Sequence, residues 1–179
     1  GFDAGHESAG VTAPATRWLL AEGSTQGHLF DTFVLVANPG TQDAVVEARY
    51  LLSDGSPFAK EYLVAATSRF NIWLNHEDPR LADAAVSTIV TSTNGVPIIV
   101  ERAMWWPGHA GTGWYEGHNS PGATVSGTAW GLAAGAVSDL GGRTDTYLLV
   151  ANTSADPGEV RVTLLFDDGA TEASFLVTN

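Results

Sequence analysis

Aromatic side chains cluster late in the sequence, where Trp105, Trp106, Trp114 and Tyr115 lie close together in a chain with six Trp among 179 residues. Exposed aromatic rings on a β-sandwich can stack on the apolar faces of sugar rings. Trp105 and Trp106 are neighbours on an expected strand, so their side chains point to opposite faces and one should reach solvent. The cluster therefore predicts a ligand-binding platform, which we expect to contain Trp105, Trp106, Trp114, Tyr115, Glu101, Glu116 and His118.

A second interpretation places the tryptophans inside the fold, because large aromatic residues are highly buried on average. Trp18 and Trp130 occupy matching positions in a repeated segment, which favours a role in the core or at a junction between repeats. Trp73 would then pack beneath a loop. The exposure of the rings decides between the two interpretations, since two exposed coplanar rings favour sugar binding and buried rings exclude it.

Carboxylates and a His–Ser pair near the aromatic residues raise hydrolysis as a further hypothesis. A glycosidase needs two carboxyl groups that face each other at ~5 to 9.5 Å. The carboxylates nearest to aromatic residues are Glu22, Glu101 and Glu116, and of these Glu101 and Glu116 are the candidates for catalysis. His118 and Ser120 are two positions apart and would share one face of a strand, where a base and a nucleophile could meet. The sequence has no Gly-X-Ser-X-Gly elbow of the kind that presents a catalytic serine.

Each of these side chains also has a structural role available. An inward Glu101 would need an arginine partner, for which Arg17, Arg49 and Arg69 are the candidates. The tract Gly-His-X-Ser-X-Gly-X-Thr, which occurs at residues 5–12 and again at residues 117–124, would be a glycine-rich linker whose polar side chains bind backbone groups. These roles predict that the chain has no catalytic residue.

The composition excludes several classes of protein. With 8 Lys and Arg against 20 Asp and Glu, the formal charge is −12, so the chain lacks the cationic surface that nucleic acid requires. It has no Cys, its histidines lack metal-ligand spacing, and Asp54, Asp167 and Asp168 fall in turns without a Ca²⁺-loop pattern. We therefore expect no metal and no cofactor.

Hydropathy and composition also bear on where the protein works. No stretch reaches the ~18 to 20 apolar residues that span a bilayer, so membrane insertion is not expected. The first residues lack the charged-then-apolar plan of a signal peptide. Acidity, a single Lys and 20 Gly suit an exported bacterial protein, so we expect an extracellular or cell-surface location.

Period-two patterns rich in Val, Leu, Phe, Tyr and Thr predict an all-β fold. The expected strands are residues 31–38, 44–52, 58–64, 68–75, 86–92 and 97–106. Asn94-Gly95 predicts a type I′ hairpin turn, in which both central residues have positive φ. One short helical segment is expected over residues 78–85, with Asp78 as N-cap and Pro79 as its first residue. Strands at this spacing predict a sandwich or a barrel. We expect an antiparallel β-sandwich, because two related sets of strands could face each other or form successive layers.

The sequence matches itself at a long period. Residues 1–18 match 113–130 at an offset of 112, and residues 31–38 match 145–152 at an offset of 114. This predicts an internal repeat of about 112–114 residues. We divide the chain into the tail of a preceding copy at 1–17, a complete unit at 18–129 and a partial second copy at 130–179, which pack as one sandwich or two.

Residues 18–25, Trp-Leu-Leu-Ala-Glu-Gly-Ser-Thr, and residues 30–40, Phe-Asp-Thr-Phe-Val-Leu-Val-Ala-Asn-Pro-Gly, resemble an uncharacterised family of repeated β-rich modules in large secreted or cell-surface bacterial proteins. Residues 100–106 are similar to a later strand of that family, and the resemblance covers most of the chain. It implies a β-rich repeat and a location outside the cell, but no chemistry. The partial copy departs from the pattern with Ala133-Ala134-Gly135 in place of Ala21-Glu22-Gly23, which argues against a role of Glu22 common to every copy.

Taken alone, the sequence favours a non-catalytic structural or adhesive module of an exported bacterial surface protein. Stacked repeats cover one another's sheet edges and need no individual active site. Their partners would be neighbouring repeats or like chains, bound through those edges. The alternative is a carbohydrate-binding module that uses the Trp/Tyr platform and binds polysaccharide, and the third hypothesis is a glycoside or ester hydrolase.

Overall fold

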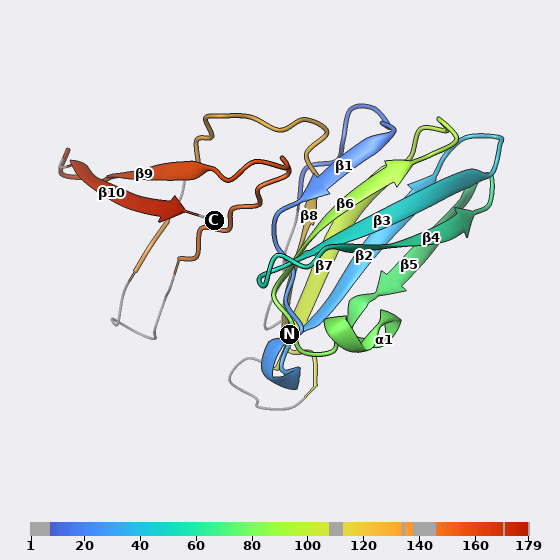
Figure 1. The fold of residues 1–179 in the computed structure, drawn as a ribbon, viewed down its shortest axis with the longest axis horizontal. Helices are drawn as coiled ribbons and strands as arrows, with labels where there is room; N and C mark the ends of the chain where they lie inside the picture. The colour runs from blue at the N-terminus through green and yellow to red at the C-terminus, as the bar shows by residue number, and fades with distance from the viewer. Residues whose placement is uncertain (1–7, 108–112, 134, 138–145, 170, 179) are drawn as a thin grey trace, which may run out of the picture. The chain divides into compact units, whose positions relative to one another are not determined.

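Two antiparallel sheets form the body of the fold in the computed structural model, which describes residues 8–107, 113–133, 135–137, 146–169 and 171–178 (Figure 1). One sheet contains, in spatial order, β1 (Arg17–Leu20), β6 (Val86–Ser92), β3 (Ala44–Leu52) and β4 (Phe58–Val64). The other contains β5 (Ser68–Trp73), β2 (Asp31–Asn38), β7 (Ile99–Trp106) and β8 (Glu116–Pro121). The two sheets are the layers of a β-sandwich, so the predicted fold class is confirmed.

Alternation along the strands decides which side chains enter the core. β2 buries Thr32, Val34, Val36 and Asn38 and leaves the residues between them half-exposed, and β3 and β6 alternate in the same way. Buried valines from both sheets meet in one hydrophobic cluster. Since each fully buried aliphatic side chain stabilises the fold by about 1.5–3 kcal/mol, this shared core holds the layers together.

Trp18 lies in that core, as one of the two interpretations of the tryptophans predicts. Its side chain is almost fully buried, and its indole N–H donates to the carbonyl oxygens of Ile98 (2.9 Å) and Ala15 (3.1 Å). The next residue, Leu19, exchanges two backbone hydrogen bonds with Ala123, just beyond β8. The segments that precede β1 and follow β8 therefore run beside the same tryptophan.

The bounds of β2, β3, β4 and β6 are those predicted from the alternation. β5 ends two residues earlier than expected, because Leu74 turns into the core as the first residue of α1 (Leu74–Glu77). β7 begins at Ile99, two residues later than expected. The alternation fixes strand interiors well, but the ends depend on the turns that follow.

The short helical turn expected within residues 78–85 is present, and it is shorter than that range. A single 3-10 turn, η2 (Pro79–Leu81), is present there, preceded by α1. Its expected start is confirmed, since the Asp78 carboxylate accepts a hydrogen bond from the Arg80 backbone N–H and Pro79 is its first residue. The guanidinium of Arg80, hydrogen-bonded to the same carboxylate, holds the pKa of Asp78 well below its usual range.

The hairpin expected at Asn94-Gly95 is wrong, because β6 and β7 lie in different sheets. The turn between them is not type I′ either, because Gly95 has a φ of 78° while Asn94 does not have positive φ. The Asn94 side chain instead hydrogen-bonds to the backbone at the start of β3. Its side-chain oxygen accepts from the Val45 N–H (3.1 Å), and its amide donates to the Asp43 carbonyl (2.8 Å). These contacts explain why the asparagine keeps an ordinary backbone conformation.

The chain divides into compact units at residues 1–149 and 150–179. The first contains the sandwich and the short turn η1 (Gln26–His28). The second contains an antiparallel hairpin of β9 (Glu159–Leu165) and β10 (Thr171–Thr178). Of the two matching segments 1–7 and 113–119, only the second is among the described residues. Residues 1–7, with His6, and Asp145 lie outside them.

Two side-chain hydrogen bonds and one strand pairing occur again 112 or 114 residues later in the chain. An indole N–H donates to the carbonyl three residues earlier at Trp18 (3.1 Å) and again at Trp130 (3.2 Å). An Asn amide donates to the carbonyl four residues later at Asn38 (2.8 Å) and again at Asn152 (2.7 Å). In the hairpins, Tyr50 pairs with Phe58, and Leu164 pairs with Glu172, which are the positions 114 residues later.

Candidate functional site

The outer face of the sheet β5-β2-β7-β8 carries a group of aromatic side chains. Cross-strand register places Phe33 between Trp73 and Ala103, and Asp31 opposite Trp105, all on the face turned away from the core. Trp114, from the segment before β8, packs on this group. We refer to Phe33, Trp73, Trp105 and Trp114, with Asp31, as the aromatic patch.

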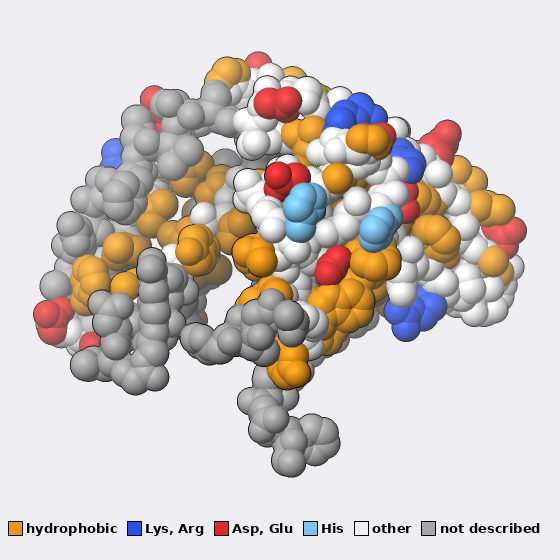
Figure 2. Space-filling view, turned by 90° about the horizontal axis from the view of Figure 1, so that it is seen from below, with side chains coloured by type: hydrophobic (Ala, Val, Ile, Leu, Met, Phe, Trp, Pro, Cys, Tyr) orange, Lys and Arg blue, Asp and Glu red, His pale blue; other side chains and the backbone are white. Residues whose placement is uncertain are grey.

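The three tryptophans of the aromatic patch remain accessible. Trp73, Trp105 and Trp114 are 36%, 40% and 53% exposed. The rings of Trp105 and Trp114 are near-parallel, with an interplanar angle of 28° and centroids 6.2 Å apart, and Trp73 meets Trp114 edge-on at the same distance. Figure 2 shows hydrophobic side chains gathered beside acidic and histidine side chains on the face seen from below Figure 1.

Asp31 holds two of the rings. Its Oδ1 accepts from the Trp73 indole N–H at 2.9 Å, and its Oδ2 accepts from the Trp114 indole N–H at 2.6 Å. Hydrogen bonds to a charged acceptor are stronger than neutral ones. The carboxylate therefore fixes two large side chains, while Phe33 stacks on Trp73 at 5.3 Å and His76 meets the same ring edge-on at 4.2 Å.

Gly117 in β8 leaves room for the ring of Trp105. A Cβ at this position would lie 2.5 Å from Cε3 of the Trp105 ring and 2.9 Å from the Met104 carbonyl oxygen. Since β8 pairs Gly117 with Trp105, the ring lies over the bare backbone of its neighbour. Only glycine allows this close approach.

The inner side of β7 and β8 carries a group of charged and polar side chains. Arg102 is buried (3% exposed) and forms an ion pair with Glu22, and burial lowers its pKa while the Glu22 carboxylate opposes that shift. Its Nη2 also lies 3.1 Å from His118 Nδ1 and 3.1 Å from Ser120 Oγ. We refer to Glu22, Arg102, His118 and Ser120 as the arginine cluster.

The contact with Arg102 selects the tautomer of a neutral His118 ring. A guanidinium can only donate, so Nδ1 of His118 accepts and the proton of the neutral ring lies on Nε2. That nitrogen lies 3.9 Å from Glu22 Oε1. His118 and Ser120 thus both accept hydrogen bonds from Arg102.

Of the two tracts expected to be linkers, the one at residues 117–124 contains most of β8, a strand at the sheet edge, so that expectation is wrong for this tract. Part of the other, at residues 5–12, lies outside the described residues. Alternate side chains of β8 pair with Arg102, Met104 and Trp106 on β7. The case of an inward Glu101 does not arise, because the inward residue is its neighbour Arg102. The buried ion pair thus joins Arg102 to Glu22, which the sequence offered only as a carboxylate near aromatic residues.

The sheet divides the predicted site residues between its two faces. Trp105 and Glu101 lie on the outer face, together with Trp114 of the aromatic patch. Trp106, Glu116 and His118 lie on the inner side, where the Trp106 indole N–H donates to Glu116 Oε2 at 2.7 Å. Tyr115 is exposed next to Trp114. Glu101 and Glu116 thus lie on opposite sides of the sheet and do not face each other as a glycosidase pair would.

Sequence reasoning missed Asp31 and misplaced Trp73, which lies on the outer face and not beneath a loop. Neither residue is near the predicted cluster in sequence, and only the strand register brings them to it. One signal was available, because the repeat retains Asp31 as Asp145.

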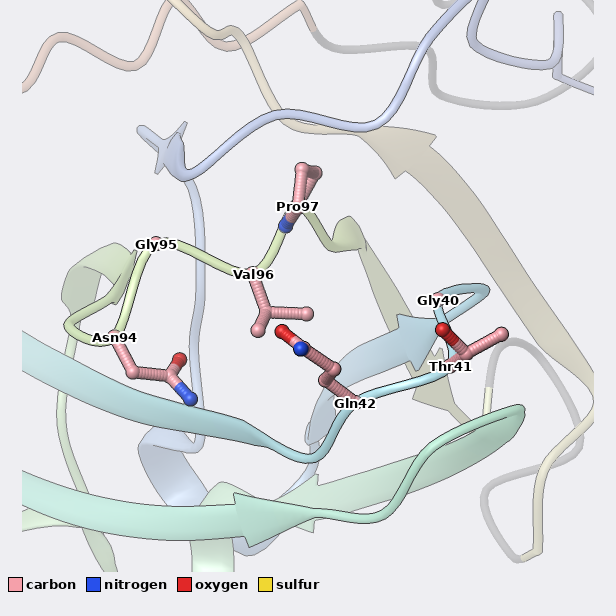
Figure 3. Close-up of a pocket in the computed structure, with 7 residues that line it drawn as sticks. All are labelled: Gly40, Thr41, Gln42, Asn94, Gly95, Val96 and Pro97. Atoms are coloured by element: carbon pink, nitrogen blue, oxygen red, sulfur yellow. The ribbon is translucent and has the colours of Figure 1, made fainter.

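Two hollows are present elsewhere in the described part of the first unit. One, of about 260 Å³, lies between two turns, with Gln42 pointing toward Val96 (Figure 3). The other, of about 450 Å³, is lined by residues 10–15 and 122–124 with Trp18. Neither is lined by a titratable side chain, so neither supplies an acid or a base.

Two further features bear on cofactors and membranes. Within the described ranges, no group of three or more His, Asp or Glu side chains converges on a position that could hold a metal ion. None of the helices in these ranges has the length and apolarity needed to cross a membrane.

Comparison with known proteins supports the fold. The sequence matches no family model and no curated protein. The structure is similar to the crystal structure of Thermotoga maritima 1070, with a TM-score of 0.52 and 17% identity over 64% of this chain and 97% of that one. It also aligns with the Anabaena sensory rhodopsin transducer, with a TM-score of 0.43 and 25% identity over 52% of this chain and 91% of that one. At this identity the first likeness concerns the fold alone.

Proposed function

We propose that the sandwich is a non-catalytic carbohydrate-binding module of an exported bacterial surface protein, and that it binds polysaccharide through the aromatic patch. The observation that carries the proposal is that three accessible tryptophans converge on one sheet face while one carboxylate, Asp31, fixes two of them. Rings held in this way bind without losing side-chain entropy, so more of the stacking free energy appears as affinity.

Exposure of these rings needs a reason, because a contiguous apolar patch on a soluble protein usually marks an interaction site. The core is already complete without them, since Trp18 and the buried valines fill it. Sugar rings suit the patch, because their C–H faces pack on indole and their hydroxyls bond to nearby polar groups.

A panel of insoluble polysaccharides and a glycan array test the proposal. We expect the wild-type chain to bind at least one carbohydrate and the Trp105→Ala, Trp114→Ala variant to bind it at least about tenfold more weakly, a loss of about 1.4 kcal/mol. Trp130→Ala is the matched control, because Trp130 is 68% exposed and lies outside the patch. Binding that survives the double substitution, or absence of binding to every carbohydrate, would exclude this function.

A second candidate, a structural or adhesive repeat module, is favoured by a different observation. The indole–carbonyl bond at Trp18, the asparagine turn at Asn38 and the hairpin pairing of Tyr50 with Phe58 recur 112 or 114 residues later in the chain. A module of this kind would bind neighbouring repeats or like chains through its edge strands. Concentration-dependent association in light scattering, with no carbohydrate bound, would favour this candidate over the first.

A further inference from the structure

The outer face of the sheet continues beyond the aromatic patch as a strip of polar side chains. In the next row along the strands, Leu35 lies between Asn71 on β5 and Glu101 on β7. In the row after that, Ala37 lies between Arg69 and Ile99. The face therefore changes from aromatic at one end to polar at the other, without leaving β2.

The polar row offers one donor and one acceptor on either side of an apolar floor. Arg69 Nη2 donates to Asn71 Oδ1 at 2.9 Å, which leaves the amide N–H₂ of Asn71 to donate elsewhere. On the other side of Leu35, the carboxylate oxygens of Glu101 can accept hydrogen bonds. Two strand spacings separate these side chains, about 10 Å, with Leu35 between them. A pyranose ring lying flat on Leu35 would direct its equatorial hydroxyls toward both.

The charge of the face selects against acidic sugars. Arg69 is the one cation among the outward residues of the four described strands, and it is already bonded to Asn71. Both oxygens of Asp31 accept indole N–H groups, and Glu101 adds a further negative charge. The two carboxylates, Asp31 and Glu101, outnumber this one guanidinium, so the face carries a net negative charge, and the formal charge of −12 repels polyanions.

The length of the strip indicates an extended ligand. From Asp31 to Ala37 the face extends about 20 Å along β2, which is long enough for several consecutive sugar units. The aromatic patch at one end supplies stacking, and the polar row at the other supplies hydroxyl recognition. A single sugar could occupy only one of the two.

We infer that this face binds an uncharged, extended polysaccharide along β2, with Asn71 and Glu101 as a hydroxyl-recognising subsite about one sugar unit or more from the tryptophans. This inference rests on the proposed function, because the aromatic patch supplies the other half of the site. It adds two residues and a ligand class to that site.

Titration calorimetry of the full chain tests the inference with cello-, xylo-, manno- and chito-oligosaccharides of two and six units. We expect a six-unit ligand to bind at least tenfold more tightly than its two-unit counterpart, with little dependence on salt. Asn71→Ala and Glu101→Ala should each weaken the six-unit ligand about tenfold and leave the two-unit ligand unchanged. Glu61→Ala is the matched control, because Glu61 is an exposed glutamate on β4 of the other sheet, and it should change neither.

The outcomes separate this inference from the proposed function. Equal affinity for both lengths, tighter binding of alginate or heparin than of the neutral ligands, or variants that behave like Glu61→Ala would overturn the inference. If such binding still requires Trp105 and Trp114, the proposed function stands. If no oligosaccharide or polysaccharide binds, both fail. Each variant is compared at equal fold stability, measured by urea unfolding.

Discussion

One carboxylate organises the aromatic patch at the scale of single residues. Asp31 begins β2, and its two oxygens accept from Trp73 and Trp114, which lie 42 and 83 positions away in sequence. Without this acceptor, two indole N–H groups would need water as their partner. The ring positions on which the proposed binding rests therefore depend on a residue that does not itself stack.

Gly117→Ala tests how closely the rings are placed. The added methyl would meet the Trp105 ring and the Met104 carbonyl oxygen, so we expect a loss of about 1–3 kcal/mol of stability, as for overpacking elsewhere, together with a changed near-ultraviolet circular dichroism spectrum. Gly131→Ala is the control, because a methyl group at that position would have no neighbouring atom within 4 Å. Equal urea midpoints and equal spectra for the two variants would contradict this account of Trp105.

At the scale of elements, a polar network joins α1 to the sheet β1-β6-β3-β4. Tyr50 OH lies 2.9 Å from Tyr62 OH, which donates to Glu77 Oε2 at 2.9 Å, and Lys60 Nζ donates to the same oxygen at 2.6 Å. Burial raises the pKa of Tyr50 to about 12. The hydrogen bond with Tyr62 lowers this pKa by a smaller amount, and the negative charge of Glu77 raises it further. The network thus requires a neutral tyrosine under the helix.

This network predicts a loss of stability in alkali. Tyrosine ionises near pH 10 in the unfolded chain and near pH 12 at Tyr50 in the fold, so its contribution is complete below pH 10 and is lost as the pH rises from 10 to 12. The loss should reach about 2–3 kcal/mol. Urea unfolding between pH 8 and 12 should show a smaller decline for Tyr50→Phe than for wild type or for Tyr115→Phe, whose side chain is exposed. Parallel curves for all three proteins would show that Tyr50 is not the group that titrates.

The elements differ in how well the sequence predicts them. β2, β3 and β6 alternate between buried and half-exposed residues, which is the pattern that apolar periodicity reveals. β8 has no such pattern, because its inward side chains meet a buried arginine and its outward Gly117 lies under a ring. The aromatic patch could be predicted only in part, since Trp73 and Asp31 join it through strand register, which no local signal encodes.

At the scale of the whole molecule, similar sequences occupy different environments. Val34 and Val36 are fully buried, whereas Leu148 and Val150, 114 residues later, are 42% and 55% exposed. The first pair belongs to β2, which is hydrogen-bonded on both sides. Burial in this fold therefore follows from the pairing of strands and not from the sequence of one strand.

Hydrogen exchange should report this difference directly. Amides of residues 31–38 open only with most of the sandwich, so we expect them to exchange on the order of a thousandfold more slowly than those of residues 146–152. Mass spectrometry of peptides from the two segments, which have similar sequences and so similar intrinsic rates, provides the comparison. Equal protection of both segments would mean that residues 146–152 are paired as β2 is.

The central claim is that the aromatic patch binds carbohydrate, and the indole N–H signals of the six tryptophans test it most directly. A ¹⁵N-labelled chain is titrated with the neutral six-unit oligosaccharides, and the assignments come from single Trp→Phe variants. We predict that the signals of Trp73, Trp105 and Trp114 shift with a common affinity, while those of Trp18 and Trp130 stay in place. Shifts confined to Trp130, or patch signals unmoved by every ligand, would contradict the claim.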